Sequence, residues 1–391
     1  MEPESSAKHE IRFTGNGETY FGIWIVNLLL TIVTIGLYSP WAKVRRLKYL
    51  YGNTLLDDSP FDYHGSPIAL FKGRLIGLLL LLAYSQTAKI SFGLWLAVVG
   101  VIAVALPWLL WKSQQFRLRN SSYRGVRFGF DGTLGQSYWT FGLPMLIFIA
   151  PYVLMGYLGF TGKFAGTPSP RIFLPIGLLF LLIMALSPWL YLRVKRYQHG
   201  NARLGSTRFT FSATVMGVYG LGFAALGLGI LALVLAALFG VGIGFVANLI
   251  AQSFTASGGD PQAASTGAPA HQVIGMVVGG VAGYATVFCV YPLVTAMRQN
   301  FIWGNTGLGG ATFQSRARGL KLLEIYVVNA FLVIVTLGLY WPYALVRTLR
   351  YQLEAISWTG DPGAVLAHAA DSGVSAVGEE TAEIFGFDLA L

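Results

Sequence analysis

The side chains that could perform chemistry in this chain are few, and they form no recognisable catalytic set. The five histidines are His9, His64, His199, His271 and His368. No two of them have the helical spacing of a metal site, and the single cysteine, Cys289, cannot form an intrachain disulfide or a multi-thiolate site. A G-x-S-x-G elbow and a Walker A loop are both absent from the sequence. We therefore expect neither enzyme activity nor a bound cofactor.

The best candidates for a binding site are amides and hydroxyls within apolar stretches. Asn27, Thr31 and Thr34 are spaced so that they share one face of a helix. Asn329 and Thr336 have the matching spacing near the other end of the chain. Two related polar faces of this kind could line a transport site at a pseudo-symmetric interface. The alternative, which we favour, is that they join helices through hydrogen bonds worth about 0.6 to 2 kcal/mol each.

The elements that must position these side chains are predicted to be membrane helices. Of the 391 residues, 54% are hydrophobic and only 11% are charged, whereas a soluble domain carries about 25% charged residues. Stretches long enough to cross about 30 Å of hydrocarbon as helices occupy residues 21–38, 68–84, 92–111, 138–158, 172–191, 215–250, 273–297 and 322–341. No acidic residue lies in the middle of a stretch, which argues against a carrier with a carboxylate proton relay.

A fixed phrase recurs beside these stretches: a proline, an aromatic residue nine positions later, an asparagine at thirteen and a phenylalanine eight beyond that. Its copies are Pro40, Tyr49, Asn53, Phe61; Pro107, Phe116, Asn120, Phe128; Pro188, Tyr197, Asn201, Phe209; and Pro292, Phe301, Asn305, Phe313. A fifth copy begins at Pro342 and Tyr351 and then loses the pattern. Spacing kept this constant predicts an internal repeat.

Each copy predicts a short series of elements. A membrane helix ends at the proline, a basic and aromatic helix continues out of the bilayer, and asparagine stops that helix because it tolerates a left-handed cap. Aromatic residues then alternate, as in Phe61-Asp62-Tyr63, which is typical of a short strand. Such fragments either pair between copies on the cytoplasmic surface or cap their own helix ends, and the sequence leaves both alternatives open.

The net charge of +10 is concentrated in the basic parts of this phrase. Because Lys and Arg in short loops favour the cytoplasmic side, we expect the copies to face the cytoplasm. Their cations can reach anionic phospholipid head groups while the aromatics stay in the interface, and we prefer this interpretation to nucleic-acid binding. The candidate lipid contacts are Arg45, Arg46, Lys48, Arg117, Arg119, Arg193, Lys195 and Arg196.

The number of crossings raises a problem of parity. If the first and last apolar stretches each cross once, and residues 215–250 also cross once, Arg45 and Arg347 end on opposite sides of the bilayer. Three solutions are open: residues 215–250 cross twice, the outer stretches are re-entrant, or the last basic pair lies outside. We expect a plain single crossing for the first stretch and leave the side of the carboxyl end open.

Two segments of the sequence resemble a known family. The stretch from Trp24 to Arg46, which contains Gly36-Leu37-Tyr38-Ser39-Pro40-Trp41, resembles the YjgN family of bacterial inner-membrane proteins. Residues 120–125 and 128–132 are similar to a second hallmark of that family. The resemblance covers about residues 10 to 358 and implies a multi-pass protein of the bacterial inner membrane. Since the family has no known function, the resemblance supplies no catalytic residue.

These patterns together predict an all-α membrane protein, a bundle of about eight transmembrane segments built from internal repeats with short cytoplasmic strand-like elements. Residues 1–20 form a polar amino-terminal segment, residues 21–358 the transmembrane domain and residues 359–391 an acidic disordered tail. The leading functional hypothesis is transport of a small solute or lipid. The alternative is a non-transporting scaffold that binds anionic lipids or partner proteins through its basic and aromatic segments. The sequence leaves the oligomeric state open.

Overall fold

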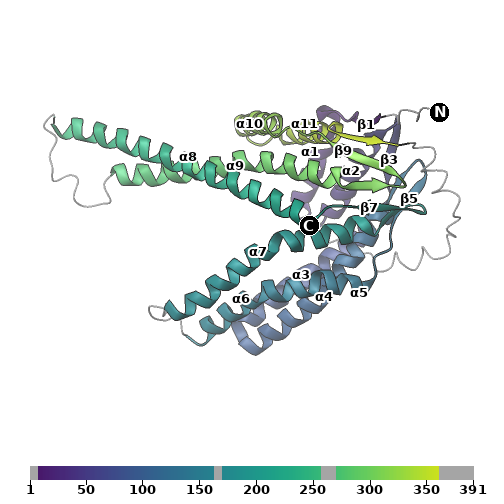
Figure 1. The fold of residues 1–391 in the computed structure, drawn as a ribbon, viewed down its shortest axis with the longest axis horizontal. Helices are drawn as coiled ribbons and strands as arrows, with labels where there is room; N and C mark the ends of the chain where they lie inside the picture. Colours follow the sequence, from purple (N-terminus) through teal and green to yellow (C-terminus); the bar gives the residue numbers. More distant parts are fainter. Residues whose placement is uncertain (1–7, 163–169, 257–269, 361–391) are drawn as a thin grey trace.

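Ten short strands close into an antiparallel barrel in the computed structural model, which describes residues 8–162, 170–256 and 270–360 (Figure 1). The strands are β1 (Lys8–Phe13), β2 (Thr54–Leu56), β3 (Ser59–Tyr63), β4 (Ser121–Tyr123), β5 (Val126–Phe130), β6 (Ala202–Leu204), β7 (Thr207–Phe211), β8 (Thr306–Leu308), β9 (Ala311–Ser315) and β10 (Ile356–Thr359). Strands of this length are unstable as single hairpins, so the ring as a whole must supply their stability.

The two ends of the described chain close the ring. Four hairpins, β2–β3, β4–β5, β6–β7 and β8–β9, follow one another around the barrel. Strand β1 pairs with β10 on one side, where Lys8 lies opposite Thr359, and with β2 on the other, where Ile11 lies opposite Leu56. Closure leaves no unpaired strand edge, and it requires the first and last strands to meet.

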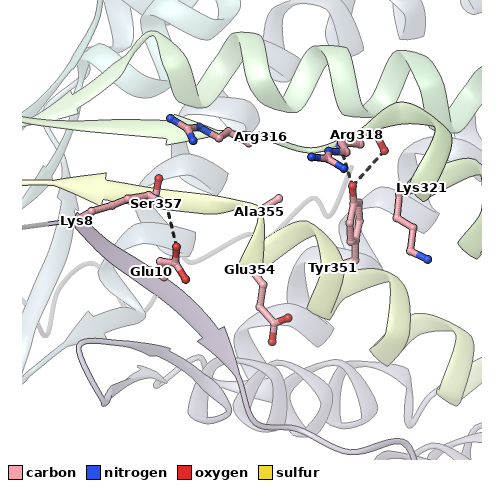
Figure 2. Close-up of a pocket in the computed structure, with 9 residues that line it drawn as sticks. All are labelled: Lys8, Glu10, Arg316, Arg318, Lys321, Tyr351, Glu354, Ala355 and Ser357. Atoms are coloured by element: carbon pink, nitrogen blue, oxygen red, sulfur yellow. Dashed lines mark hydrogen bonds and ion pairs between the residues drawn. The ribbon is translucent and has the colours of Figure 1, made fainter.

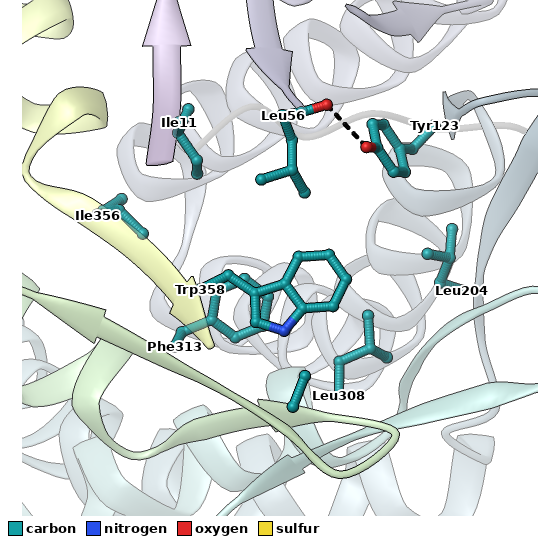
Figure 3. Close-up of a cluster of buried hydrophobic side chains, with 9 residues drawn as sticks. Ile11, Leu56, Tyr123, Leu204, Leu308, Phe313, Ile356 and Trp358 are labelled. Carbon is teal, nitrogen blue, oxygen red and sulfur yellow. Dashed lines mark hydrogen bonds between the residues drawn. The ribbon is translucent and has the colours of Figure 1, made fainter. Parts of the chain in front are cut away.

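Apolar side chains fill the barrel. Figure 3 shows residues from different strands pointing toward a common centre, with Trp358 among them. The buried cluster comprises Ile11, Leu56, Tyr123, Leu204, Leu308, Ala311, Phe313, Ile356 and Trp358. The ring of Phe313 stacks on that of Trp358, with centroids 5.8 Å apart. The Tyr123 hydroxyl donates to the Leu56 carbonyl at 2.8 Å, so its polar atom is satisfied inside the barrel.

Pairs of helices join successive hairpins. The helices are α1 (Gly17–Val33), α2 (Ser39–Gly52), α3 (Pro67–Ile90), α4 (Phe92–Arg119), α5 (Leu134–Ser137), the π-helix η1 (Tyr138–Gly142), α6 (Leu143–Phe160), α7 (Pro170–Gly200), α8 (Val215–Ala256), α9 (Ala270–Gly304), α10 (Gly319–Val335) and α11 (Trp341–Glu354). The first helix of each pair leaves the barrel and the second returns to it. Figure 1 shows the pairs extending to one side of the barrel, with α8 and α9 reaching farthest.

Five helices of the described residues are long and apolar enough to cross a membrane: Pro67–Ile90, Phe92–Arg119, Gly177–Gly200, Val215–Val246 and Gly279–Gly304. The bent pair Leu134–Gly142 and Pro144–Phe160 makes a sixth if it counts as one span. Between 0% and 18% of the most apolar window of each of the five helices is buried within the protein. Apolar side chains exposed to this degree suit contact with lipid tails rather than water.

The prediction of an all-α bundle with about eight transmembrane segments is therefore wrong. The strand-like fragments, which were expected only as accessories, close into a barrel, and five or six helices, not eight, have the length of a span. The first and last apolar stretches account for the difference. Helices α1 and α10 have 17 residues each, which makes each about 25 Å long at 1.5 Å per residue.

Each of these short helices turns back toward the barrel. After α1, Ile35 has a φ of 50° and Gly36 a φ of 86°. After α10, Leu337 and Gly338 have nearly the same values, 51° and 94°. The left-handed turns reverse the chain, so α2 and α11 run back and end at β2 and β10. The single crossing expected for the first stretch is thus incorrect, because β1 and β2, before and after it, pair in one barrel. Since α8 is one continuous helix, re-entrant outer stretches are the alternative that fits this fold.

In the middle copies the helices continue through the proline that was predicted to end them, whereas Pro40 and Pro342 of the outer copies lie at the start of α2 and α11. Pro107 lies inside α4 and Pro292 inside α9. A proline weakens the hydrogen bonding of the preceding turn, and tyrosines of neighbouring helices supply donors there. The Tyr138 hydroxyl donates to the Val104 carbonyl at 2.7 Å. The Tyr219 hydroxyl donates to the Ala185 carbonyl, three residues before Pro188, at 2.8 Å.

The recurring asparagines end the returning helices and also connect neighbouring hairpins. Their side-chain amides donate to the carbonyl four residues earlier, at 2.7, 2.8, 2.9 and 2.7 Å for Asn53, Asn120, Asn201 and Asn305. Their own carbonyls accept a backbone N–H from the preceding hairpin, as in His64 N–H to Asn120 at 2.8 Å. Ala355 occupies the corresponding position before β10, and its carbonyl accepts the backbone N–H of Arg316 at 2.9 Å. Of the two alternatives for the strand fragments, the structure shows pairing between neighbouring units.

Candidate functional site

The first predicted polar group lies in the re-entrant pair α1 and α2, and its hydrogen bonds stay within that pair. The Asn27 amide donates to the Ala42 carbonyl on α2 at 3.4 Å. The Thr31 hydroxyl donates to the Asn27 carbonyl at 2.6 Å. The Thr34 hydroxyl donates to the Leu30 carbonyl at 2.7 Å and accepts the Tyr38 N–H at 3.0 Å, which fixes the reversing turn.

The second group repeats this arrangement in α10 and α11. The Asn329 amide donates to the Ala344 carbonyl and to the Thr348 hydroxyl, both at 3.1 Å. The Thr336 hydroxyl accepts the Tyr340 N–H at 3.0 Å, as Thr34 does for Tyr38. These bonds support the favoured packing role. Asn27 and Asn329 nevertheless each keep a buried Oδ1 without a hydrogen-bond partner among the described residues.

The predicted lipid contacts form a band where the returning helices meet the barrel, which we call the basic collar. Three further arginines, on α9 and α11, belong to it and were not in the prediction. The basic collar consists of Arg45, Arg46, Lys48, Arg117, Arg119, Arg193, Lys195, Arg196, Arg298, Arg347 and Arg350. A sequence signal for one of them existed, since Arg298 follows Pro292 by the same six residues that separate Arg46 from Pro40.

Some collar side chains hold neighbouring elements in place. Arg193 donates to the Trp139 carbonyl at 2.6 Å, and its guanidinium lies 4.9 Å from the Trp139 ring centroid. Arg196 donates to the Ala213 carbonyl at 2.8 Å. Arg350 donates to the Gly15 carbonyl at 2.7 Å and so joins α11 to the loop before α1. By contrast, Arg45, Arg46 and Lys48 on α2 are exposed, although Arg46 also interacts with the hydroxyl of the buried Tyr20.

Three cations of the basic collar lie near the ends of helices that lead into successive hairpins of the barrel. Lys195 on α7 lies within electrostatic reach of Arg117 on α4 and Arg298 on α9. Lys195 Nζ donates to Gln198 Oε1 at 3.0 Å, and Arg117 donates to Gln114 Oε1 at 2.7 Å. Because α4, α7 and α9 contain no aspartate or glutamate, neutral amides are the partners that these helices offer.

Tyrosines fasten the two helices of a pair together at the barrel. The Tyr49 hydroxyl accepts the Asn16 N–H at 2.9 Å and donates to the Asn16 carbonyl at 2.8 Å. In the same way, the Tyr351 hydroxyl accepts the Arg318 N–H at 2.8 Å and donates to the Arg318 carbonyl at 3.1 Å. Burial raises the pKa of Tyr49 above its ordinary value, and the Asn16 hydrogen bond and the Arg350 charge oppose that rise. The same cause, burial, raises the pKa of Tyr123 in the barrel.

A cavity of about 460 Å³ lies where the first and last strands meet, beside the barrel (Figure 2). It is lined by Lys8, Glu10, Arg316, Arg318, Lys321, Tyr351, Glu354, Ala355 and Ser357. Part of its charge is neutralised locally, since Lys8 pairs with Glu10 at 2.9 Å and Lys321 with Glu324 at 2.8 Å. The cavity thus contains both acidic and basic side chains, which makes it a weaker candidate for an anion site than the cations on α4, α7 and α9.

Metal binding finds no support in the part of the chain that the structure describes, where no cluster of three His, Cys, Asp or Glu side chains could hold an ion. His9 lies against Asp57 at 2.5 Å, and His64 lies 3.7 Å from Asp62. His271 lies in α9, but the structure does not describe its side chain. His368 lies outside the described residues.

Comparisons with known proteins identify the family to which this chain is similar. The model of a family described as "Bacterial protein of unknown function (DUF898)" matches residues 8–384. The chain is 34% identical over 149 residues to "Inner membrane protein YjgN" of Salmonella typhimurium, which covers 38% of each chain. It is 34% identical over 143 residues to the protein of the same name from Escherichia coli O157:H7, covering 36% of each. The chain thus matches less than two fifths of these relatives' length, and no solved structure matches it.

Proposed function

The chain belongs to the DUF898 family of bacterial proteins of unknown function, and from this premise we propose that it retains anionic phospholipids in the inner membrane through its basic collar. It is an inner-membrane protein, as its relatives are named, and its described helices include several of membrane-spanning length. The barrel serves as a rigid ring on the cytoplasmic face that sets the collar cations at one level.

The observation that carries this proposal is the position of the collar. Its cations lie at the barrel end of α2, α4, α7, α9 and α11, between a polar barrel surface and helices whose apolar side chains are exposed. This is the level at which phosphate head groups lie when the helices are in lipid. Each Lys or Arg near an anionic surface contributes about 1 kcal/mol of attraction, so a collar of this size supports stable retention.

The filled barrel supports lipid retention over passage of a solute along the barrel axis. Trp358 is 1% exposed and Tyr123 is 2% exposed, and both lie in the interior cluster. A solute would have to displace these side chains, which pack at the density of a protein core. We therefore assign the barrel a scaffolding role.

A charge-reversal experiment on α2 tests the proposal. Arg45, Arg46 and Lys48 are exposed, so replacing them by glutamate mainly reverses surface charge, and the one buried contact affected is that of Arg46 with Tyr20. We expect the variant, reconstituted in phosphatidylcholine vesicles that contain phosphatidylglycerol, to retain less phosphatidylglycerol after extraction into neutral detergent. The matched control, R45K/R46K/K48R, keeps every charge and should retain the wild-type amount. Wild-type retention by the glutamate variant would contradict the proposal.

Passage of a small solute is a second candidate, favoured by one observation. The buried Oδ1 atoms of Asn27 and Asn329 occupy corresponding places in the two re-entrant pairs and have no partner among the described residues. Such acceptors could coordinate a solute in two adjacent helix pairs, since α1 contacts α11. Flux of candidate solutes into proteoliposomes should then fall in the N27L/N329L variant. Unchanged flux in a folded variant would remove both residues from the mechanism.

We also interpret the helix pairs with their hairpins as copies of one repeated unit. The shared positions of the asparagine caps and of the tyrosines support this interpretation. A repeat would explain why the collar cations recur at one level around the ring.

A further inference from the structure

Three collar cations come from three helices, since the hairpin that follows α7 lies in the ring between the hairpins that follow α4 and α9. Lys195 lies within electrostatic reach of Arg117 and Arg298. His199, one turn after Lys195, lies within reach of both Lys195 and Arg117. The barrel fixes the ends of α4, α7 and α9 through β4, β6 and β8, so these side chains cannot separate simply by moving their helices apart.

No carboxylate balances this charge within the described residues. The three cations form no ion pair there, and their helices carry no aspartate or glutamate. The hydrogen-bond partners of Lys195 and Arg117 are the neutral side chains Gln198 and Gln114. Like charges held close together repel, and an anion placed among them would relieve that repulsion.

A buried hydroxyl beside the cations provides an independent indication of a ligand. Tyr191 lies one turn before Lys195, and its hydroxyl is buried without a hydrogen-bond partner among the described residues. Lys195 Nζ lies 5.8 Å from the centroid of the Tyr191 ring, and the charge of Arg298 reaches Tyr191. Since a buried polar group without a partner is costly, the hydroxyl is poised to donate to an incoming oxygen.

We propose that Arg117, Lys195, Arg298 and Tyr191 together bind one phosphate group. A phosphate presents several acceptor oxygens and negative charge, which match two guanidinium groups, one ammonium and one hydroxyl. Arg117 and Arg298 are exposed, so a ligand can reach the site. This inference rests on the proposed function and gives the retained lipid a specific location. The phosphate belongs either to a phospholipid head group or to free inorganic phosphate.

Binding to the purified full chain in neutral detergent tests the site, with two matched variants. R117Q/K195Q removes two cations of the site, and R119Q/R196Q removes two collar cations from the same helices. The probes are phosphatidylglycerol in mixed micelles and inorganic phosphate, each titrated separately. We expect R117Q/K195Q to weaken binding of phosphatidylglycerol at least about tenfold, and R119Q/R196Q to weaken it much less. If inorganic phosphate shows the same pattern and phosphatidylglycerol does not bind, the site takes free phosphate.

The conservative variant Tyr191→Phe tests whether a loss of binding could be caused by misfolding. It removes one hydroxyl and leaves the packing of the ring, so binding should weaken severalfold while the melting temperature stays close to wild type. Equal losses in R117Q/K195Q and R119Q/R196Q would overturn the specific site and leave the proposed collar function intact. Failure of the R45E/R46E/K48E variant to lose phosphatidylglycerol would instead overturn the collar function, which keeps the two failures distinct.

Discussion

Lys8 and Thr359 lie opposite each other in β1 and β10, and this pairing of the first and last strands completes the barrel. The chain can therefore close its ring only after the last strand is present. Every helix pair between them begins and ends at the barrel, so the pairing also determines on which side the returning helices end.

Removing the largest side chain of the barrel interior should destabilise the whole protein. Trp358 is 1% exposed and packs on Phe313. We expect Trp358→Ala to lower the free energy of unfolding by about 3–5 kcal/mol, because it leaves a cavity at the closing strand. Thermal unfolding in detergent measures the effect. Trp341→Ala is the control, since Trp341 is 54% exposed, and an equal loss in both variants would contradict the assigned core.

Tyr123 should make stability fall at alkaline pH. Burial raises the pKa of Tyr123 above its ordinary value of 10.0. The unfolded chain then loses its proton first as the pH rises above about 10, so the contribution of the protonated hydroxyl declines from there. At neutral pH we expect Tyr123→Phe to cost about 1 kcal/mol, through loss of the bond to Leu56. This difference should shrink above pH 10 in unfolding measurements, and a constant difference would refute the assignment.

The tyrosine that fastens α11 to α10 should contribute measurably to stability. Tyr351 makes two hydrogen bonds to the backbone of Arg318. We expect Tyr351→Phe to lower the free energy of unfolding by about 1 kcal/mol. Tyr340→Phe provides the comparison, because the interaction of Tyr340 is ring stacking on Tyr343, which a phenylalanine keeps. If both substitutions have the same effect in thermal unfolding, the Tyr351 bonds are not stabilising.

The tips of the re-entrant pairs should lie within hydrocarbon. Ile35 is 94% exposed and Leu337 is 93% exposed, although both are apolar. In a Cys289→Ala background, Ile35→Cys and Leu337→Cys should react with a membrane-permeant maleimide and resist a charged one added on either side. Asp62→Cys on the barrel should react with both reagents. Rapid labelling of either tip by the charged reagent would show that it reaches water.

Much of the local structure could be predicted from the sequence. The fixed spacing from Tyr49 to Asn53 predicted a helix end, which the structure confirms. The expected left-handed cap is wrong, because Asn53 has a φ of −101° and its side-chain amide caps the helix instead. The alternation in Phe61-Asp62-Tyr63 predicted a short strand, which is β3. These features depend on neighbouring residues, so the local pattern carries the information.

The global arrangement could not be predicted in this way. Pairing of β1 with β10 joins segments at opposite ends of the chain, and no local pattern specifies it. Pro107 was predicted to end a helix, but α4 continues through it. The Tyr138 hydroxyl bonds the Val104 carbonyl in the turn before Pro107. Because Tyr138 lies in another helix, the local sequence around Pro107 does not reveal this bond. The convergence of Arg298 on Lys195 likewise depends on how the barrel places α7 and α9. The predicted acidic tail lies beyond Gly360, outside the described residues, except for its first two positions.

The central claim is that all helix pairs leave and re-enter a barrel on one face of the membrane. Sided cysteine labelling of intact cells and inverted vesicles, in a Cys289→Ala background, tests it most directly. We expect Asp62→Cys and Arg208→Cys, on separate barrel hairpins, to react only from the cytoplasm, and Ile90→Cys and Thr161→Cys, at the far ends of α3 and α6, only from the periplasm. Labelling of Asp62→Cys and Arg208→Cys from opposite sides would contradict the account.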